Sequence, residues 1–120
     1  MKKILIVDDS EDIRNLMVMA FKNDYELETI ADGMTAFNQI SVNQYDLLLT
    51  DFEMPGLNGL ELIQNTLALN PDLPIIVMTG NEEAVPILRQ SGAKACFQKP
   101  LDFARLKLSI INLLDQKTPQ

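Results

Sequence analysis

The feature that most constrains the fold of this 120-residue chain is a regular alternation of short apolar runs with segments of helical periodicity. Three runs, at residues 4–7, 46–50 and 73–78, are rich in Ile, Val and Leu and have polar or turn residues on both sides, as is typical of buried strands. Two weaker runs, at residues 25–30 and 95–98, repeat the same spacing. The sequence therefore predicts a sheet of five strands.

Helical patterns lie between these runs. The clearest follows Ser10, a plausible N-cap, and repeats apolar residues three and four positions apart. The apolar positions of the predicted helices are Ile13, Leu16, Met17, Ala20 and Phe21; Ala36 and Ile40; Leu60, Ile63 and Leu67; and Phe103, Leu106, Ile110, Leu113 and Leu114. Because Pro86 would remove a hydrogen bond from a helix interior, we expect the fourth helix to begin late, with Pro86 in its first turn.

Strands that alternate with helices favour parallel pairing through right-handed crossovers, so the helices should cover both faces of the sheet. The predicted fold class is therefore a doubly wound α/β domain. No linker rich in Pro, Gly or Ser divides the chain. We expect one domain over residues 1–116 and a loose tail over residues 117–120.

The charge balance limits the possible partners. Acidic residues outnumber Lys and Arg by 17 to 10, and the formal charge of -7 repels nucleic acid and anionic membranes, so we expect no direct binding to either. The single cysteine, Cys96, has no intrachain partner, which favours a reducing, cytoplasmic location. No apolar stretch approaches the roughly 18 to 20 residues that cross a bilayer.

Polar residues gather at the predicted carboxyl ends of four strands. They are Asp8 and Asp9 after the first strand, Asp51 at the end of the third, Thr79 at the end of the fourth and Lys99 at the end of the fifth. In parallel sheets these ends share one edge, where ligands bind. Carboxylates packed together repel unless a cation compensates, and Mg²⁺ prefers oxygen ligands. Zn²⁺ is disfavoured because the chain has no His and one Cys.

Four motifs carry a resemblance to a known family: VDDS at 7–10, TDFEMPGLNG at 50–59, MTG at 78–80 and QKP at 98–100. Together they resemble the receiver domains of bacterial-type response regulators, over essentially the whole chain. Each motif alone is weak, but this order and spacing are jointly specific.

The resemblance implies a flavodoxin-like strand order 2-1-3-4-5 and a function in two-component signalling. Asp51 would accept a phosphoryl group from a phosphohistidine on a histidine kinase or histidine phosphotransfer protein in trans. The implied Mg²⁺ ligands are Asp8, Asp9, Asp51 and the backbone carbonyl of Glu53. Lys99 would neutralise developing charge, and Thr79 would hydrogen-bond the new phosphoryl group. Such a domain promotes only its own phosphorylation and dephosphorylation, so it is not an enzyme for other substrates.

By the same resemblance, phosphorylation would shift a face formed by the fourth helix, fifth strand and fifth helix, where an effector protein or a second copy reads the state. One position departs from the family pattern: Cys96 stands where receivers usually carry Tyr or Phe. The neighbouring Phe97 should point to the opposite face of its strand. Cys96 is best interpreted as a small buried apolar residue. The resemblance also suggests a cis bond between Lys99 and Pro100.

Three alternatives stay open at this point. Asp8 and Asp9 could cap the first helix, and Asp51, Thr79 and Lys99 could each be ordinary turn or surface residues. The chain could be a flavodoxin-like carrier or a phosphohydrolase, although flavodoxins need a Ser/Thr-rich phosphate loop and the hydrolases need Asp where this chain has Glu53. It could also be a scaffold that works without phosphorylation.

The last helix carries a second apolar group in addition to its core stripe, formed by Ala104, Leu108 and Ile111. At about 100° per residue this group lies well round the helix from the stripe, where a simple surface helix would be polar. It could be a set of scattered exposed residues, which are common, or a contact patch shared with the fourth helix and fifth strand.

Overall fold

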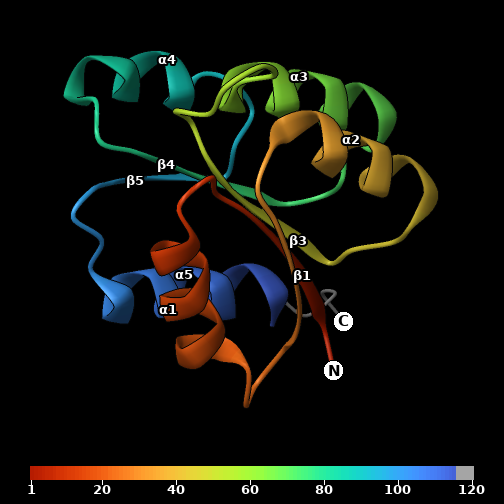
Figure 1. Cartoon of the computed structure of the whole chain (residues 1–120), viewed down its shortest axis with the longest axis vertical. Coiled ribbons are helices and arrows are strands. Elements are labelled where there is room, and N and C mark those ends of the chain that lie inside the picture. The colour runs from red at the N-terminus through yellow and green to blue at the C-terminus, as the bar shows by residue number, and fades with distance from the viewer. Residues whose placement is uncertain (116–120) are drawn as a thin grey trace, which may run out of the picture.

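The computed structural model describes residues 1–115 and shows a five-stranded parallel sheet in the order β2-β1-β3-β4-β5 (Figure 1). The strands are β1 (Lys3–Val7), β2 (Glu26–Ile30), β3 (Leu47–Asp51), β4 (Ile75–Thr79) and β5 (Ala95–Gln98). The predicted fold class and strand order are thus confirmed. The domain boundary predicted at residue 116 and the tail at 117–120 lie outside the described residues.

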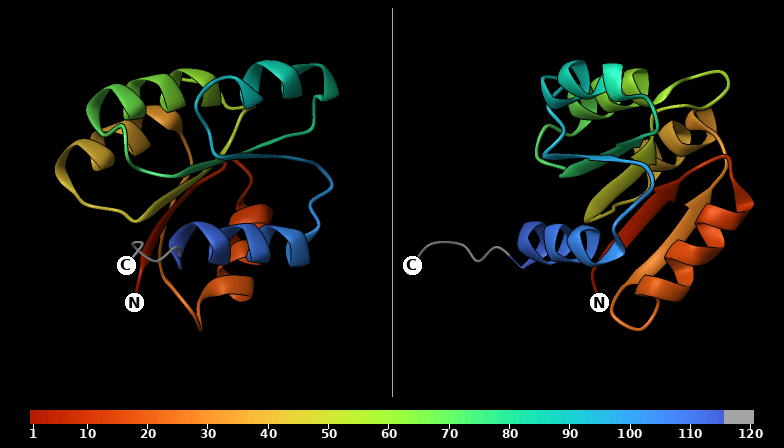
Figure 2. Two further views of the ribbon diagram at one scale, coloured as in Figure 1. Left: turned by 180° about the vertical axis from the view of Figure 1, so that it is seen from behind. Right: turned by 90° about the vertical axis from the view of Figure 1, so that its left-hand side faces the viewer.

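Helices cover both faces of the sheet, as predicted. They are α1 (Glu11–Phe21), α2 (Gly33–Val42), α3 (Gly59–Leu69), α4 (Val85–Arg89) and α5 (Phe103–Leu114). Helices α1 and α5 lie on one face and α2, α3 and α4 on the other, which is clearest in the side view (Figure 2). Within the part of the chain that the structure describes, no helix is long and apolar enough to cross a membrane.

The strands supply two apolar cores because successive side chains point to opposite faces of a sheet. In β1, Leu5 and Val7 pack in the core under α2, α3 and α4, while Ile4 and Ile6 pack under α1 and α5. Every residue of β3 and β4 is buried, whereas the edge strands β2 and β5 are largely half-buried or exposed. Burial on both faces explains why the central strands appear in the sequence as continuous apolar runs and the edge strands as weaker ones.

The helix termini follow their sequence signals. Ser10 caps α1 by accepting a hydrogen bond from the Ile13 N–H at 3.3 Å, as predicted. Helix α4 is only five residues long and follows a 3₁₀ turn at Glu82–Ala84, with Pro86 in its first turn. Its late start is therefore confirmed, because a proline is tolerated where no intrahelical N–H bond is required.

Several predicted strand bounds were wrong by one or two residues. Strand β3 extends to Asp51 and begins at Leu47, one residue after the predicted start. Strand β4 begins at Ile75 instead of residue 73. Pro74 has no N–H for the ladder, although its carbonyl accepts a bond from the Leu48 N–H at 3.0 Å.

The core stripe predicted for α1 was too wide. Met17 and Phe21 are buried, but Leu16 is 49% exposed and Ala20 is also exposed. A short helix at the sheet margin contacts the core along a narrow strip, and its outer apolar residues face solvent. In α5 the predicted stripe is confirmed, with Leu106, Ile110 and Leu114 buried and Phe103 and Leu113 partly buried.

We predict that Gly59→Ala destabilises the domain while Gly80→Ala does not. A Cβ at Gly59 would lie 2.6 Å from both the Asp51 carbonyl oxygen and the Phe52 Cα, which are backbone atoms that no side-chain rotation can move. A Cβ at Gly80 would meet nothing within 4 Å. Urea unfolding should show a loss of about 2 kcal/mol for Gly59→Ala and a change within about 0.5 kcal/mol for Gly80→Ala. Equal stabilities would contradict the close approach of α3 to β3.

Candidate functional site

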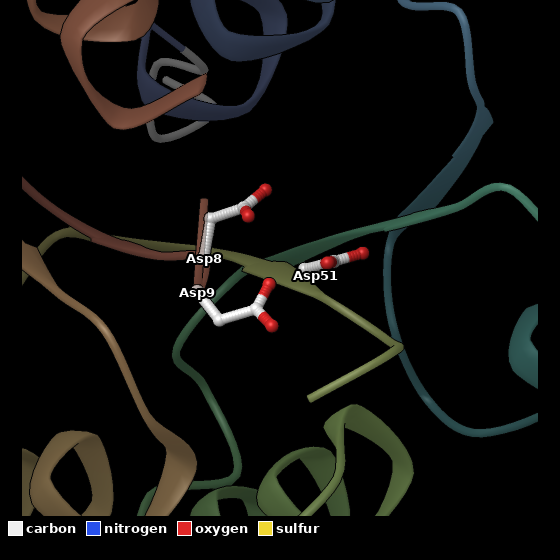
Figure 3. A group of neighbouring side chains, drawn as sticks. All are labelled: Asp8, Asp9 and Asp51. Atoms are coloured by element: carbon white, nitrogen blue, oxygen red, sulfur yellow. The ribbon is translucent and has the colours of Figure 1, made fainter. Parts of the chain in front are cut away.

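The carboxylates of Asp8, Asp9 and Asp51 converge at the carboxyl edge of the sheet. Strands β1 and β3 are neighbours, and their register pairs Val7 with Thr50, so the next residues, Asp8 and Asp51, lie side by side. One oxygen from each of the three carboxylates lies within 4.8 Å of the others. Figure 3 shows the three side chains extending past the ends of β1 and β3 into the same space. The predicted acidic cluster is therefore present.

Asp8 is fixed in place, whereas Asp9 is open to solvent. The Asp8 side chain is fully buried; its Oδ1 accepts a hydrogen bond from the Ser10 N–H at 2.9 Å, and its main-chain carbonyl accepts one from Arg14 at 2.7 Å. Asp9 is exposed. Because Ser10 caps α1, the helix-cap alternative does not explain either aspartate. The Asp8 carboxylate is therefore held rigidly, and the cluster is open to solvent on the side of Asp9.

A single cation, Lys99, faces the two buried carboxylates. Its Nζ lies 3.2 Å from Asp51 Oδ1 and 3.6 Å from Asp8 Oδ2. Asp51 is only 2% exposed. Among residues 1–115, no donor makes a well-formed hydrogen bond to either oxygen, although both are buried. One ammonium cannot neutralise three carboxylates, so the cluster keeps an excess of negative charge.

The excess of negative charge affects the pKa of Asp51. Burial, and then the charge of Asp8, raise the pKa of Asp51 to about 6, and Lys99 only partly offsets them. For Lys99, burial lowers the pKa, but the carboxylates of Asp51 and Asp8 outweigh it, so the pKa is raised. Both shifts mean that the site favours additional positive charge.

The donor set fits Mg²⁺. Asp8 Oδ2 and Asp51 Oδ1 are buried oxygens with free lone pairs, and Asp9 adds an exposed carboxylate. The Glu53 main-chain carbonyl accepts no hydrogen bond from any described residue. Mg²⁺ binds a few carboxylates and keeps several waters, which this half-open arrangement allows.

The side chain of Glu53 is the part of the site that the sequence did not predict. Thr79 ends β4, and its hydroxyl donates to Glu53 Oε2 at 2.5 Å, while the Gly80 N–H donates to Oε1 at 3.3 Å. The Thr79 oxygen also accepts the Asn81 N–H at 2.9 Å. Burial raises the pKa of Glu53, but the bonds from Thr79 and Gly80 hold it below its usual value. The acidic residue two positions after Asp51 is the sequence feature that could have indicated this contact.

The departure at Cys96 has a structural consequence. Cys96 is half-buried against the core of α2, α3 and α4, while Phe97 packs in the opposite core, as predicted. Burial raises the pKa of the Cys96 thiol, and the charge of Arg89 only partly offsets it. The thiol is therefore a small apolar filler and not an activated nucleophile. The Lys99–Pro100 bond is cis, as the resemblance suggested.

Comparisons with known proteins agree with this geometry. The family model described as response regulator receiver domain matches residues 4–111. Sporulation initiation phosphotransferase F of Bacillus subtilis is 30% identical over 98% of this chain and 97% of that protein. The chain belongs to the response regulator receiver domain family. It is a two-component receiver domain with Mg²⁺ as its cofactor, and the carboxylates of Asp8, Asp9 and Asp51 could hold a metal ion.

Other relatives show the range of proteins that carry such a domain. The DNA-binding transcriptional regulator NtrC of Azospirillum brasilense is 32% identical over 97% of this chain, which spans 25% of that protein. The structure of the response regulator TrrA of Thermotoga maritima, in complex with Mg²⁺ and BeF, has a TM-score of 0.89 and 33% identity. That match covers 95% of this chain and all of that one. The receiver fold is therefore shared with both short and long proteins.

We predict that Asp51→Asn stabilises the metal-free protein at pH 7. The pKa of Asp51 is about 6 in the folded state against 3.8 ordinarily, so the folded state holds the proton more tightly. Stability is then lost as the pH rises from about 4 through about 6, by an amount on the order of 2 kcal/mol. Urea unfolding in chelator should give the mutant a higher free energy of unfolding at pH 7.

The pH dependence provides the control. Near pH 4 the Asp51 carboxyl is protonated in the folded state and roughly half protonated in the unfolded state, so the difference between wild type and Asp51→Asn should shrink. A difference that does not change between pH 4 and pH 7, or a less stable mutant at pH 7, would show that Asp51 is not held in an unfavourable ionised form.

Proposed function

We propose that Asp51 accepts a phosphoryl group from a phosphohistidine on a separate kinase or phosphotransfer protein. The observation that carries this proposal is the position of Asp51 in a buried acidic pocket: its side chain is 2% exposed, its Oδ1 has no well-formed hydrogen bond from residues 1–115, and Lys99 lies 3.2 Å away. A carboxylate in this setting is kept free to attack phosphorus. Family membership supports the same role.

In the proposed reaction a bond forms between an Asp51 carboxylate oxygen and phosphorus, and the bond from phosphorus to the donor imidazole nitrogen breaks. The imidazole leaves and takes up a proton from solvent. Lys99 neutralises charge on the transferred group, because its ammonium already lies between Asp51 and Asp8. When bound, Mg²⁺ supplies further charge neutralisation.

We propose for the residues of the site the roles that the resemblance implies. Asp8, Asp9, Asp51 and the Glu53 carbonyl would hold Mg²⁺, and the Thr79 hydroxyl would bind the product phosphoryl group. We also propose that the domain acts only on itself, promoting its own phosphorylation and dephosphorylation. The cytoplasmic location expected from the single thiol stays a prediction.

The rival functions have less support. A flavodoxin-like carrier would need hydroxyl groups after β1, where this chain places Asp8 and Asp9 around a cation site. A scaffold that works without phosphorylation has no need for Asp8, Asp51 and Lys99 to converge, because their burial is costly without a ligand.

The proposed output surface is the face of α4, β5 and α5, where an effector or a second copy would bind. Strand β5 is a sheet edge, and Ile87 of α4 is an apolar side chain that is 53% exposed. Leu108 of α5 is 60% exposed, in line with the apolar flank expected there. Ile111 is different: it is half-buried and lines a hollow of about 390 Å³ with Tyr25. The Ile111 end of the flank therefore lies toward Tyr25, just before β2.

We predict that acetyl phosphate with Mg²⁺ adds a single phosphate to wild type, detected as an intact-mass shift, and that Asp51→Asn removes it. The matched control is Asp72→Asn, which changes an exposed aspartate in the turn before β4 and should leave the mass shift unchanged. A shift that persists in Asp51→Asn at a comparable rate would assign the phosphate to another residue.

The same samples test the output surface. If phosphorylation is transmitted to α4 and β5, the amide resonances of Ile87 and Cys96 should shift in the phosphorylated wild type and stay in place in Asp51→Asn. The amide of Val42, at the end of α2, is the reference that should not move. Shifts confined to the ends of β1 and β3 would argue against this surface.

A further inference from the structure

The Glu53 carboxylate occupies two hydrogen-bond donors at the end of β4 at the same time. Its Oε2 accepts the Thr79 hydroxyl at 2.5 Å and its Oε1 accepts the Gly80 N–H at 3.3 Å. The Thr79 oxygen is itself held by the Asn81 N–H at 2.9 Å. The hydroxyl has one proton, and the short contact commits it to Glu53. The alternative acceptor, the Asn81 carbonyl, lies farther away at 3.4 Å.

These donors lie at the end of the strand next to the one that carries Asp51. Strands β3 and β4 are paired, with Asp51 beside Met78, so Thr79 and Gly80 follow directly at the neighbouring strand end. A phosphoryl group on Asp51 would present several anionic oxygens to this strand end. The Glu53 carboxylate is a smaller anion that already accepts hydrogen bonds from the Thr79 hydroxyl and the Gly80 N–H. The phosphoryl group would need the same two donors.

We propose that Glu53 is an intramolecular competitor of the phosphoryl group, which binds Thr79 and Gly80 in the unphosphorylated protein and must leave when Asp51 is modified. The inference rests on the proposed function of Asp51. Two costs oppose phosphorylation: the Thr79 proton cannot serve both anions, and the two negative groups repel each other.

The position of Glu53 makes its departure feasible. Glu53 is exposed and lies in the segment between β3 and α3, so its side chain can turn into solvent without uncovering the core. Its main-chain carbonyl would stay at the metal pocket. The Glu53 side chain would thus set how readily the phosphorylated form is populated, while the main-chain carbonyl of the same residue would bind Mg²⁺.

The test compares binding of beryllium fluoride in the presence of Mg²⁺ by wild type, Glu53→Gln and Glu53→Ala, followed by calorimetry. Glu53→Ala frees both donors and should lower the half-saturating concentration about tenfold, as expected for the loss of a charged hydrogen bond at a partly exposed site. Glu53→Gln removes only the charge and should lie between it and wild type. Glu82→Gln is the matched control, because it removes an exposed carboxylate in the turn after Thr79 that makes no side-chain hydrogen bond or ion pair within residues 1–115.

Two further readouts separate the inference from the proposed function. In the free protein, the Gly80 amide resonance should move in Glu53→Ala and stay in place in Glu82→Gln, whether or not Asp51 binds anything. Absence of binding to wild type, or equal binding by Asp51→Asn, would overturn the proposed function and with it the competition. If wild type binds and Glu53→Ala binds equally or more weakly, Glu53 is not a competitor.

Discussion

The structure depends on an unbalanced charge at one edge of the sheet. Asp8 and Asp51 are buried side by side with Asp9 next to them, and Lys99 is the ammonium that faces them among residues 1–115. A fold tolerates this arrangement only if the rest of the domain holds the carboxylates in place. The completely buried strand β3 and the close approach of Gly59 to Asp51 do so. The site is therefore rigid, anionic and suited to a divalent cation.

The same imbalance explains how phosphorylation can alter a surface. In the proposed reaction, a phosphoryl group on Asp51 would place a new anion near Glu53, which already accepts the hydrogen bonds of the donors at the end of β4. The Glu53 side chain and the phosphoryl group could not both keep these donors, so the β4 end would have two alternative arrangements. A 3₁₀ turn at Glu82–Ala84 leads from β4 into the short helix α4, which has Pro86 in its first turn and few hydrogen bonds of its own to resist a shift.

Most of the fold could be predicted because each central strand is buried on both faces and each crossover carries a helix. The five key side chains could be placed because parallel strands end at a common edge. Two kinds of feature could not be predicted. Leu16 and Ile111 depend on how widely α1 and α5 contact their neighbours, which periodicity alone does not fix. The contact of Glu53 with Thr79 joins the loop after β3 to the end of β4, so it depends on a loop conformation that has no sequence period.

We expect the three carboxylates to bind one cation together, because Lys99 neutralises only part of their charge. Calorimetric titration of Mg²⁺ into wild type, Asp8→Asn, Asp9→Asn and Asp51→Asn tests this expectation. Wild type should bind a single ion, and the affinity should be at least about tenfold weaker in each mutant, because each loses a charged ligand. Unchanged affinity in all three mutants, or no Mg²⁺ binding to wild type, would contradict it.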